Sequence, residues 1–559
     1  MLRFTHIILL LSCSLFTSLW AQSFRIEDFK KNFSKEEWVK VNGNIGITGS
    51  YYTSQPSYDR QPWTGSIVGN VNISLFNLIN LPFSINLTNT GINYTYPNLP
   101  NRFSFHPSYK WATLHVGDIS TSYSPYTLSG HQFTGLAVDL KPDNWEASVM
   151  FGRMQRAVEY DSLNKYTAVP AAYKRLGIGA KLKYNHNRFY VGANVFLAKD
   201  YVNSLKWQPD SLGILPQQNV CASIEAGVFI IPSLQLSFIY GFSFLDRDIR
   251  FLDIEKTNLY HSIKAEINYS IKTHKIGLGY ERIDPQYQTL GAYYFNNDLE
   301  NITAQYAGSF WENKINLSTR AGFERNNLLD DKSDKQIRVV GSIQIDAKPI
   351  EPLQLSAMYS NFQNHQRIKS QFDYINEFDE IENSDTLNYQ QVSHQADFTA
   401  SYQIKKDSAL IHNLQLTASY QLGTDKYVKE DSIATNNQMI NSMLMYRLQF
   451  LQQKLALNIS LNYTNNKLSE HITHYFGPVV GCNVSFINET LRLNTSISCN
   501  AGYVDNNLDQ VISNLRLSLS YILKEKHCFT WSANGQYKHQ TNNIPAYLFN
   551  TSLSYSYSF

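Results

Sequence analysis

Two stretches of this chain carry residue types that could bind a metal ion. Glu470, His471 and His474 bring a carboxylate and two imidazoles together, at a spacing that suits a metal when the residues lie on a helix. A second stretch, 373–385, is rich in carboxylates that could bind calcium. They are Asp373, Glu377, Asp379, Glu380, Glu382 and Asp385. Neither stretch has a helical pattern, and the acidic one lacks the glycine-centred turn of a calcium loop. We therefore expect solvated loops here, and no metal or other cofactor.

The remaining reactive residues do not form the pattern of an enzyme. Cys13 falls in the N-terminal leader, and the other four cysteines are isolated and lack Cys-x-x-Cys spacing, which favours packing thiols over a metal site or a disulfide framework. No short-range Ser/His or Asp/His pair, phosphate-binding loop or nucleotide fingerprint is present. The net charge of +2 argues against nucleic acid as a partner. We expect no catalytic activity.

The elements that carry these residues are clearest at the end of the chain. From Ala546 to Phe559, apolar or aromatic residues alternate with serine and asparagine, which indicates a strand with one apolar and one polar face. Such an ending is typical of a transmembrane β-barrel, whose last strand pairs with its first. It also resembles the C-terminal signal by which bacterial outer-membrane proteins are recognised for insertion by the barrel assembly machinery. We interpret Tyr555, Tyr557 and Phe559 as that assembly signal.

The beginning of the chain has the pattern of a secretory signal peptide. Arg3 and His6 precede a short apolar run, and Ala21 stands at the −1 position of a cleavage site. A membrane anchor and a lipoprotein cleaved at Cys13 are the alternatives; the apolar run is short, and it resumes after the cysteine. The expected domains are a signal peptide at 1–21, a short periplasmic arm at 22–37 and a transmembrane barrel at 38–559.

Composition fits strands that face lipid on one side and water on the other. Mean hydropathy is −0.32, because a half-apolar strand averages out. Charged residues are 17% of the chain, fewer than the ~25% of ordinary soluble domains. Each midplane lysine or arginine on the lipid face would cost about 2–4 kcal/mol. The strand pattern therefore predicts that Lys264, Glu266, Arg320 and Glu324 face the lumen.

Connection lengths predict the topology. Counted back from the last strand, short turns alternate with longer polar segments, as in outer-membrane barrels with short periplasmic turns and longer outside loops. The pattern holds from about residue 143 onward and fails over 77–130. The expected fold is all-β, a transmembrane antiparallel barrel of roughly 24 strands (22–26). Examples of predicted periplasmic turns are 350–351 and 525–526, and examples of predicted outside loops are 363–387, 424–436 and 465–474.

One hairpin interrupts this alternation. A strand ends at Gly117, a turn with Pro125 follows, and a glycine-spaced strand restarts before Gly135. Gly130 and Gly135 predict positive φ, a bulge or a close backbone approach. The stretch resembles the repeated Gly-(Asp/Asn)-Ile segments of the type 9 secretion translocon barrel and, more distantly, the Gly-Asp segment of fimbrial ushers. The matching positions are Gly117, Asp118, Ile119, Leu128, Gly130 and Gly135. The resemblance implies a large secretion-type barrel.

This hairpin is the predicted constriction of the lumen. A barrel of this size encloses more space than side chains fill, and we expect no separate plug domain. Arg153 and Arg156, on the next strand, could form a charged part of the constriction. The alternatives are an ordinary bulged hairpin in the wall, and an interface or loop cluster for the two arginines.

Together these patterns predict a protein of the bacterial outer membrane. We expect a channel, or a component of an export machine, with outer-membrane lipid and a periplasmic or surface protein as partners. The alternative is a structural or adhesive surface protein that acts through its long outside loops; an outer-membrane enzyme ranks third.

Overall fold

The computed structural model describes most of the chain beyond Trp38. The described ranges are 38–56, 61–89, 102–159, 171–210, 213–250, 258–329, 337–362, 364–366, 390–424, 436–468, 471–541 and 544–559. The expected signal peptide and arm, the acidic stretch 373–385, Glu470 and most of the loops predicted at 363–387 and 424–436 lie outside these ranges. Among the described residues, no helix is long and apolar enough to cross a membrane.

Strands make up nearly all of the described chain, with one short 3-10 helix at Val202–Ser204. In chain order they are β1 (Val39–Gln55), β2 (Trp63–Leu75), β3 (Ile79–Thr88), β4 (Arg102–Phe105), β5 (Ser108–Tyr109), β6 (Ala112–Ser120), β7 (Gln132–Leu140), β8 (Trp145–Gln155), β9 (Lys174–Asn185), β10 (Phe189–Tyr201), β11 (Gln218–Ile231), β12 (Leu234–Asp246), β13 (Asn258–Ile271), β14 (His274–Ile283), β15 (Leu299–Phe310), β16 (Ile315–Asn326), β17 (Ile337–Ile350), β18 (Leu353–Ser360), β19 (Asn364–Gln366), β20 (Gln390–Lys406), β21 (Leu410–Thr424), β22 (Asn436–Phe450), β23 (Leu455–Leu468), β24 (His471–Phe486), β25 (Leu491–Val504), β26 (Asn507–Leu523), β27 (His527–Gln540) and β28 (Ala546–Ser558).

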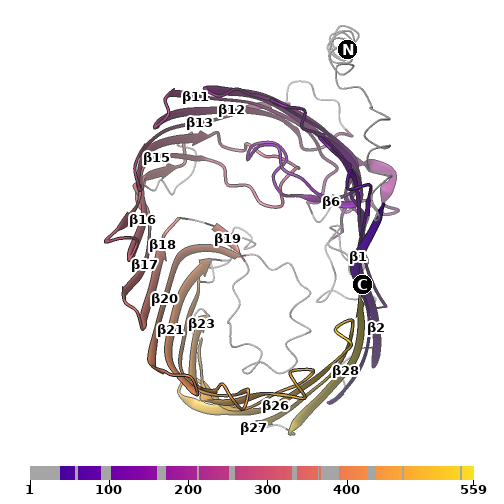
Figure 1. Ribbon diagram of the computed structural model, residues 1–559. Coiled ribbons are helices and arrows are strands. Elements are labelled where there is room, and N and C mark those ends of the chain that lie inside the picture. Colours follow the sequence, from indigo (N-terminus) through magenta and orange to yellow (C-terminus); the bar gives the residue numbers. More distant parts are fainter. Residues whose placement is uncertain are drawn as a thin grey trace.

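The strands close into one antiparallel barrel, seen as a ring in Figure 1. Each strand pairs with its neighbour in the sequence, and β28 returns to pair with β1, from Asn44 opposite Ser558 to Gln55 opposite Tyr547. β4 and β5 occupy one position in the wall between β3 and β6, and β18 and β19 both pair with β20. The described wall therefore has 26 strand positions. The predicted closed barrel is confirmed, and its strand number is the upper limit of the predicted range.

Short and long connections alternate from β1 to β23, which corrects the expectation that the pattern fails over 77–130. Beyond β23, the connections 469–470 and 505–506 are also short. The cause of the miscount is the strand between β3 and β6. His106 and Pro107 divide it into β4 and β5, because proline has no N–H to give to the ladder. Once the two pieces are counted as one strand, the β6–β7 connection falls on the same end of the barrel as the other long connections.

One predicted long loop is also mostly strand. β23 continues to Leu468 and β24 begins at His471, so most of the polar segment 465–474 pairs across the hairpin. His471 and His474 are three positions apart on one strand and therefore point to opposite faces. His474 Nδ1 lies 3.0 Å from the Tyr463 hydroxyl, and His471 Nδ1 lies 3.2 Å from an Asp505 carboxylate oxygen.

The two faces of the barrel differ as the alternation predicts. Large apolar residues on the outer face are exposed, for example Phe238 at 44% and Ile302 at 60%. The alternate positions turn inward and are mostly polar. Lys264 and Glu266 form an ion pair there at 3.0 Å, and the Arg320 Nε donates to the Thr303 hydroxyl at 3.3 Å. Register is thereby fixed, because a slip by one residue would turn these charges outward.

Candidate functional site

The connection between β6 and β7 lies inside the ring, where Figure 1 shows it beside the label of β6. It begins with a tight turn in which the Thr127 N–H donates to the Ser124 carbonyl at 3.2 Å. Pro125 occupies the second position of this turn, where its fixed φ is favourable. The Tyr123 N–H then donates to the Leu128 carbonyl at 2.8 Å, which returns the chain toward β7.

Polar side chains fasten this connection to wall strands well beyond its own hairpin. The Thr127 hydroxyl donates to the Asn194 Oδ1 of β10 at 2.6 Å, and both side chains are buried. The Tyr126 hydroxyl donates to a Glu281 carboxylate oxygen of β14 at 2.7 Å. A connection that leaves the wall at β6 and reaches β14 must run along the inner face of the strands between them.

A second connection, 284–298 between β14 and β15, meets the first one inside the barrel. Leu128 and Gly291 form a parallel β-bridge, and the Ser129 N–H donates to the Gly291 carbonyl at 2.9 Å. The Tyr287 hydroxyl donates to the Tyr126 carbonyl at 2.8 Å. Gly291 is required here, because a Cβ would lie 2.6 Å from the Thr127 carbonyl oxygen. The two connections therefore form one docked unit.

Asn219 of β11 joins this unit to the wall. Its side-chain amide donates to the Gln288 carbonyl at 3.2 Å and to the Ser243 hydroxyl at 2.9 Å, while its Oδ1 accepts the Leu290 N–H at 3.1 Å. The residue is completely buried. Its loss would leave the Leu290 N–H without this acceptor in a site that excludes water, whereas the Gln288 carbonyl would keep the Ser243 hydroxyl at 2.6 Å.

Apolar side chains fill the space between the connections and the wall. We call this cluster the inner core; its members are Ile119, Tyr123, Leu128, Phe133, Ala137, Met150, Met154, Phe196, Ala198 and Leu290. Leu128, Phe133, Met150 and Phe196 are completely buried. In most of the barrel wall the inward face is polar, so this apolar patch exists to hold the folded-in connections in place.

His131, at the end of the first connection, is buried in the same unit. Its ring stacks on Tyr293 of the second connection at 4.1 Å between centroids, and its Nδ1 donates to the Gln132 carbonyl at 2.7 Å. Burial lowers the pKa of His131 to about 4, although the hydrogen bond to Gln132 opposes that effect. The imidazole is therefore neutral at pH 7.

The structure places the predicted glycines and Leu128 at this site. Gly117 and Gly130 have φ of +101° and +67°, and a Cβ at Gly135 would lie 2.1 Å from the Phe151 carbonyl oxygen of β8. The predicted positive φ and close backbone approach are thus both present. Leu128 forms the bridge to the second connection.

Arg153, Arg156 and Asp118 are not brought to the inner core. Along β8, Met150 and Met154 face inward. Arg153 therefore falls on the outer face, together with the exposed Val149 and Phe151. Its register partner Thr134 donates its hydroxyl to Asp118 at 2.7 Å. Arg156 follows the end of β8. This alternation along β8 differs from the expectation that Arg153 lines the lumen.

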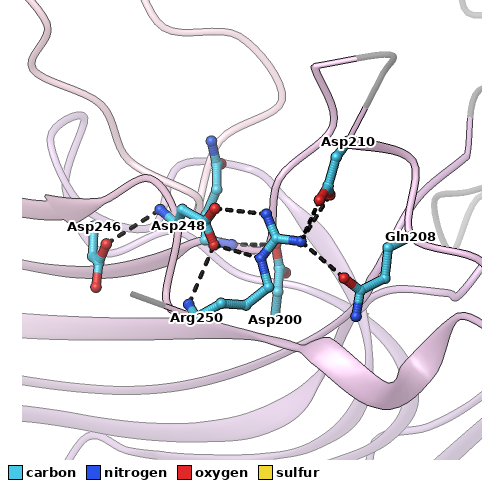
Figure 2. A network of polar contacts seen from close by, with 7 residues as sticks. Asp200, Gln208, Asp210, Asp246, Asp248 and Arg250 are labelled. Atoms are coloured by element: carbon cyan, nitrogen blue, oxygen red, sulfur yellow. Dashed lines mark hydrogen bonds and ion pairs between the residues drawn. The ribbon is translucent and has the colours of Figure 1, made fainter. Parts of the chain in front are cut away.

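A cluster of charges joins the connections on the long-loop end of the barrel (Figure 2). The Arg250 guanidinium donates to Asp248 at 2.7 and 2.6 Å and to Asp210 at 2.8 and 2.7 Å. The side-chain hydrogen bonds that Arg250 donates lower the pKa of the Asp248 carboxyl. Asp200, at the end of β10, is buried and accepts a bidentate pair from Arg175. We call Arg250, Asp248, Asp210, Asp200 and Arg175 the Arg250 cluster. It joins the β10–β11 connection to the β12–β13 connection.

The predicted assembly signal lies at the seam of the barrel. The Phe559 N–H donates to the Gly43 carbonyl at 3.1 Å, and the Gly43 N–H donates back at 3.2 Å. The ring centroids of Tyr557 and Phe559 are 5.7 Å apart, and the Tyr555 hydroxyl lies 2.9 Å from His527 Nδ1. These aromatics therefore extend the outer face where the first and last strands meet.

The second connection is what sequence reasoning missed. By its length it belongs with the longer connections that the sequence pattern assigns to outside loops, yet Tyr287 and Leu290 are buried. The signal was its composition, because 284–298 is rich in aromatic and apolar residues and contains one central glycine. Among the described residues, no group of three or more His, Cys, Asp or Glu side chains is arranged to hold a metal ion.

Comparisons with known proteins find no matching family model and no matching curated protein. Among solved structures, the chain is similar to the FrpB iron transporter from Neisseria meningitidis (F3-3 variant), with 10% identity, 96% of this chain and 83% of that chain covered, and a TM-score of 0.38. It is similar to the copper transporter OprC, with 12% identity, 93% and 81% covered, and a TM-score of 0.37. It is also similar to BauA, the ferric preacinetobactin receptor from Acinetobacter baumannii, with 9% identity, 93% and 81% covered, and a TM-score of 0.34. The barrel architecture itself rests on the strand pairing of the chain.

Proposed function

We propose that this chain is a Gram-negative outer-membrane barrel that acts as a channel, narrowed on one side by its own two folded-in connections. The observation that carries the proposal is the bridge between Leu128 and Gly291 inside a closed wall. The bridge joins two long connections inside the barrel, where they occupy part of the lumen. The apolar outer face supports a place in the membrane.

The size of the barrel supports a passage beside this unit. Barrels of 16–18 strands already leave an aqueous channel, and this wall has 26 strand positions. The inner core covers the inward face around β6–β10, with polar contacts that reach β14. The facing wall, β22–β28, has polar inward side chains. Solute would therefore pass between the docked connections on one side and the polar inward face of β22–β28 on the other.

Orientation in this proposal follows connection length. Turns such as 350–351 face the periplasm, and the long connections, together with the Arg250 cluster, face outside. The signal peptide at 1–21 and the arm at 22–37 remain part of the proposal, with the barrel assembly machinery and outer-membrane lipid as partners.

Two finer versions differ in what uses the lumen and the loops. In an export component, a periplasmic or surface protein partner would gate the passage; the resemblance around Gly117 and Gly135 supports this version. In an adhesive surface protein, the outside loops would act and the lumen would stay closed; the ordered Arg250 cluster supports that alternative. A measurement of ion conduction distinguishes the export component from the adhesive surface protein.

The test is conductance of the purified, refolded full chain in a planar lipid bilayer. We expect discrete single-channel steps that are absent from a mock preparation lacking the protein. Added periplasmic extract that reduces those steps would support the partner-gated version. Correctly folded barrel that produces no steps, with or without extract, would contradict the channel and favour the adhesive alternative.

A further inference from the structure

Six histidines on the outer face of the described wall each pair with a tyrosine of the neighbouring strand. In every pair the tyrosine hydroxyl lies 2.5–3.0 Å from the histidine Nδ1, and the ring centroids are 5.9–6.3 Å apart. Strand alternation places both rings with the exposed apolar residues, as with Leu444 near Tyr446 and Leu414 near His412.

The pairs form two rows, one at each end of the barrel. The long-loop row consists of Tyr240–His261, Tyr359–His394 and Tyr463–His474. The turn row, at the end with the turns 272–273 and 407–409, consists of Tyr306–His274, Tyr446–His412 and Tyr555–His527.

The spacing of the rows matches the thickness of a membrane. On β13, ten residues separate His261 of the long-loop row from Ile271, which stands opposite His274 of the turn row. The same count separates the rows on β21. Ten residues rise about 34 Å along a strand, which is about 24–28 Å along the membrane normal when strands tilt by roughly 35–45°. The apolar band of such barrels is ~25 Å tall.

In all six pairs the histidine is the member farther from the middle of the barrel. Tyr240 is opposite Ile263, and its partner His261 stands two positions beyond that residue toward the nearer end. The other five pairs have the same two-residue step in the same sense. Each tyrosine ring therefore lies on the apolar side of its pair, and each imidazole lies on the side of the water.

This geometry leaves one donor free on each histidine. A tyrosine O–H can donate to Nδ1, and a neutral imidazole whose Nδ1 accepts carries its hydrogen on Nε2. At His474 the Asn465 side-chain amide nitrogen, which only donates, also lies 2.8 Å from Nδ1. Among the described residues, none hydrogen-bonds to the Nε2 atom of any of these six histidines.

We propose that the two rows bind the phosphate groups of membrane lipids, with the tyrosine hydroxyl orienting the imidazole and the Nε2–H donating to a phosphate oxygen. An anionic oxygen makes the stronger hydrogen bond, and phosphates lie just outside the apolar band, where the histidines are. An ordinary aromatic girdle needs rings at this depth but no oriented N–H donor. The inference rests on the membrane location in the proposed function, and not on conduction.

The test compares the refolded full chain in two kinds of vesicle. One contains dimyristoylphosphatidylglycerol, and the other contains digalactosyldiacylglycerol with the same acyl chains and no phosphate. The measurement is the temperature at which heat-modifiable gel mobility is lost. We expect wild type to be more stable in the phospholipid, because neutral sugar oxygens accept weaker hydrogen bonds than phosphate does.

A tyrosine variant of the turn row isolates the orienting hydroxyls. It combines Tyr306→Phe, Tyr446→Phe and Tyr555→Phe, which keep every ring and every histidine. Most of the phospholipid advantage should disappear. The matched control combines Tyr269→Phe, Tyr402→Phe and Tyr521→Phe, three exposed outer-face tyrosines at the same end that have no histidine partner among the described residues. It should keep most of the advantage.

A histidine variant removes the donors themselves. His274→Phe, His412→Phe and His527→Phe together should abolish the turn row's share of the phospholipid advantage while the aromatic girdle stays complete. Equal stability of wild type in both vesicles, or equal losses in the paired and control tyrosine variants, would overturn the phosphate assignment. A phospholipid advantage without bilayer conductance would leave the rows standing and refute the channel, whereas conductance without the advantage would do the reverse.

Discussion

Leu128 and Gly291 form a parallel bridge inside the barrel, although one lies between β6 and β7 and the other between β14 and β15. The bridge joins two connections on the same end of the wall, and the Asn219 side chain then binds the second of them to β11. Buried side chains from several strands hold both connections against the wall. The docked unit should therefore respond to changes at single buried residues.

Asn219→Ala should loosen the docked unit. The substitution removes all the hydrogen bonds of the Asn219 side chain and leaves the Leu290 N–H without this acceptor, while the Gln288 carbonyl keeps the Ser243 hydroxyl. Each buried group left unpaired costs about 1–3 kcal/mol. We expect heat-modifiable mobility to be lost at a lower temperature than in wild type. Asn494→Ala, an inward amide on the opposite wall, is the control, and an equal loss in both variants would argue against a special role for Asn219.

Acid should weaken the same unit through His131. Its pKa is about 4 in the folded protein and about 6.5 when the side chain is exposed, so the undocked state binds a proton first. Stability of the docked state should therefore fall as the pH drops from about 6.5 to 4, and change no further through this group below that range. His131→Phe keeps a ring against Tyr293 and removes the titration.

Bilayer recordings between pH 7 and 4 measure this effect. Wild type should open more often, or to larger steps, as the solution is acidified, and His131→Phe should respond less. Identical pH profiles in the two proteins would assign the acid response to other groups.

Barrel closure should depend on Phe559. Its backbone exchanges two hydrogen bonds with Gly43, and its ring contacts Tyr557. Phe559→Ser should lower the amount of inserted barrel while secretion into the periplasm continues. The neighbouring Ser558→Ala keeps the aromatic and serves as control. Wild-type amounts of heat-modifiable Phe559→Ser protein in outer membranes would show that the aromatic is dispensable.

Topology can be checked by cysteine labelling of intact cells. Glu351 occupies a short turn, and its side chain is 94% exposed; Leu329 lies on a long connection and is 63% exposed. An impermeant maleimide should label Leu329→Cys and not Glu351→Cys, with the natural-cysteine protein as background. The reverse pattern would invert the barrel.

Much of the wall could be predicted from the sequence, because strand alternation and turn length are local properties. The seam was predicted from the aromatic alternation that ends at Phe559, and the inward charges from the cost of exposing Lys264 to lipid. Local properties failed where the chain departs from them, because Pro107 divided a strand and shifted the strand count. Arg153 was expected at the lumen because of its charge, whereas the alternation of β8 places it with the outer-face residues.

The candidate site was predictable only in part. Gly130 and Gly135 marked the first connection because backbone strain leaves a trace in residue type. The second connection left no such trace beyond its apolar content, since its docking depends on Gly291 meeting Leu128 across a long sequence separation.

The central claim is that the folded-in connections narrow a conducting lumen, and single-channel conductance of a variant lacking residues 120–129 tests it most directly. The deletion removes Tyr126, Thr127 and Leu128, and with them the contacts to Glu281, Asn194 and Gly291. In a correctly inserted, heat-modifiable barrel, we predict larger conductance steps than in wild type. Unchanged steps would contradict the account, because the hairpin would then be part of an ordinary wall.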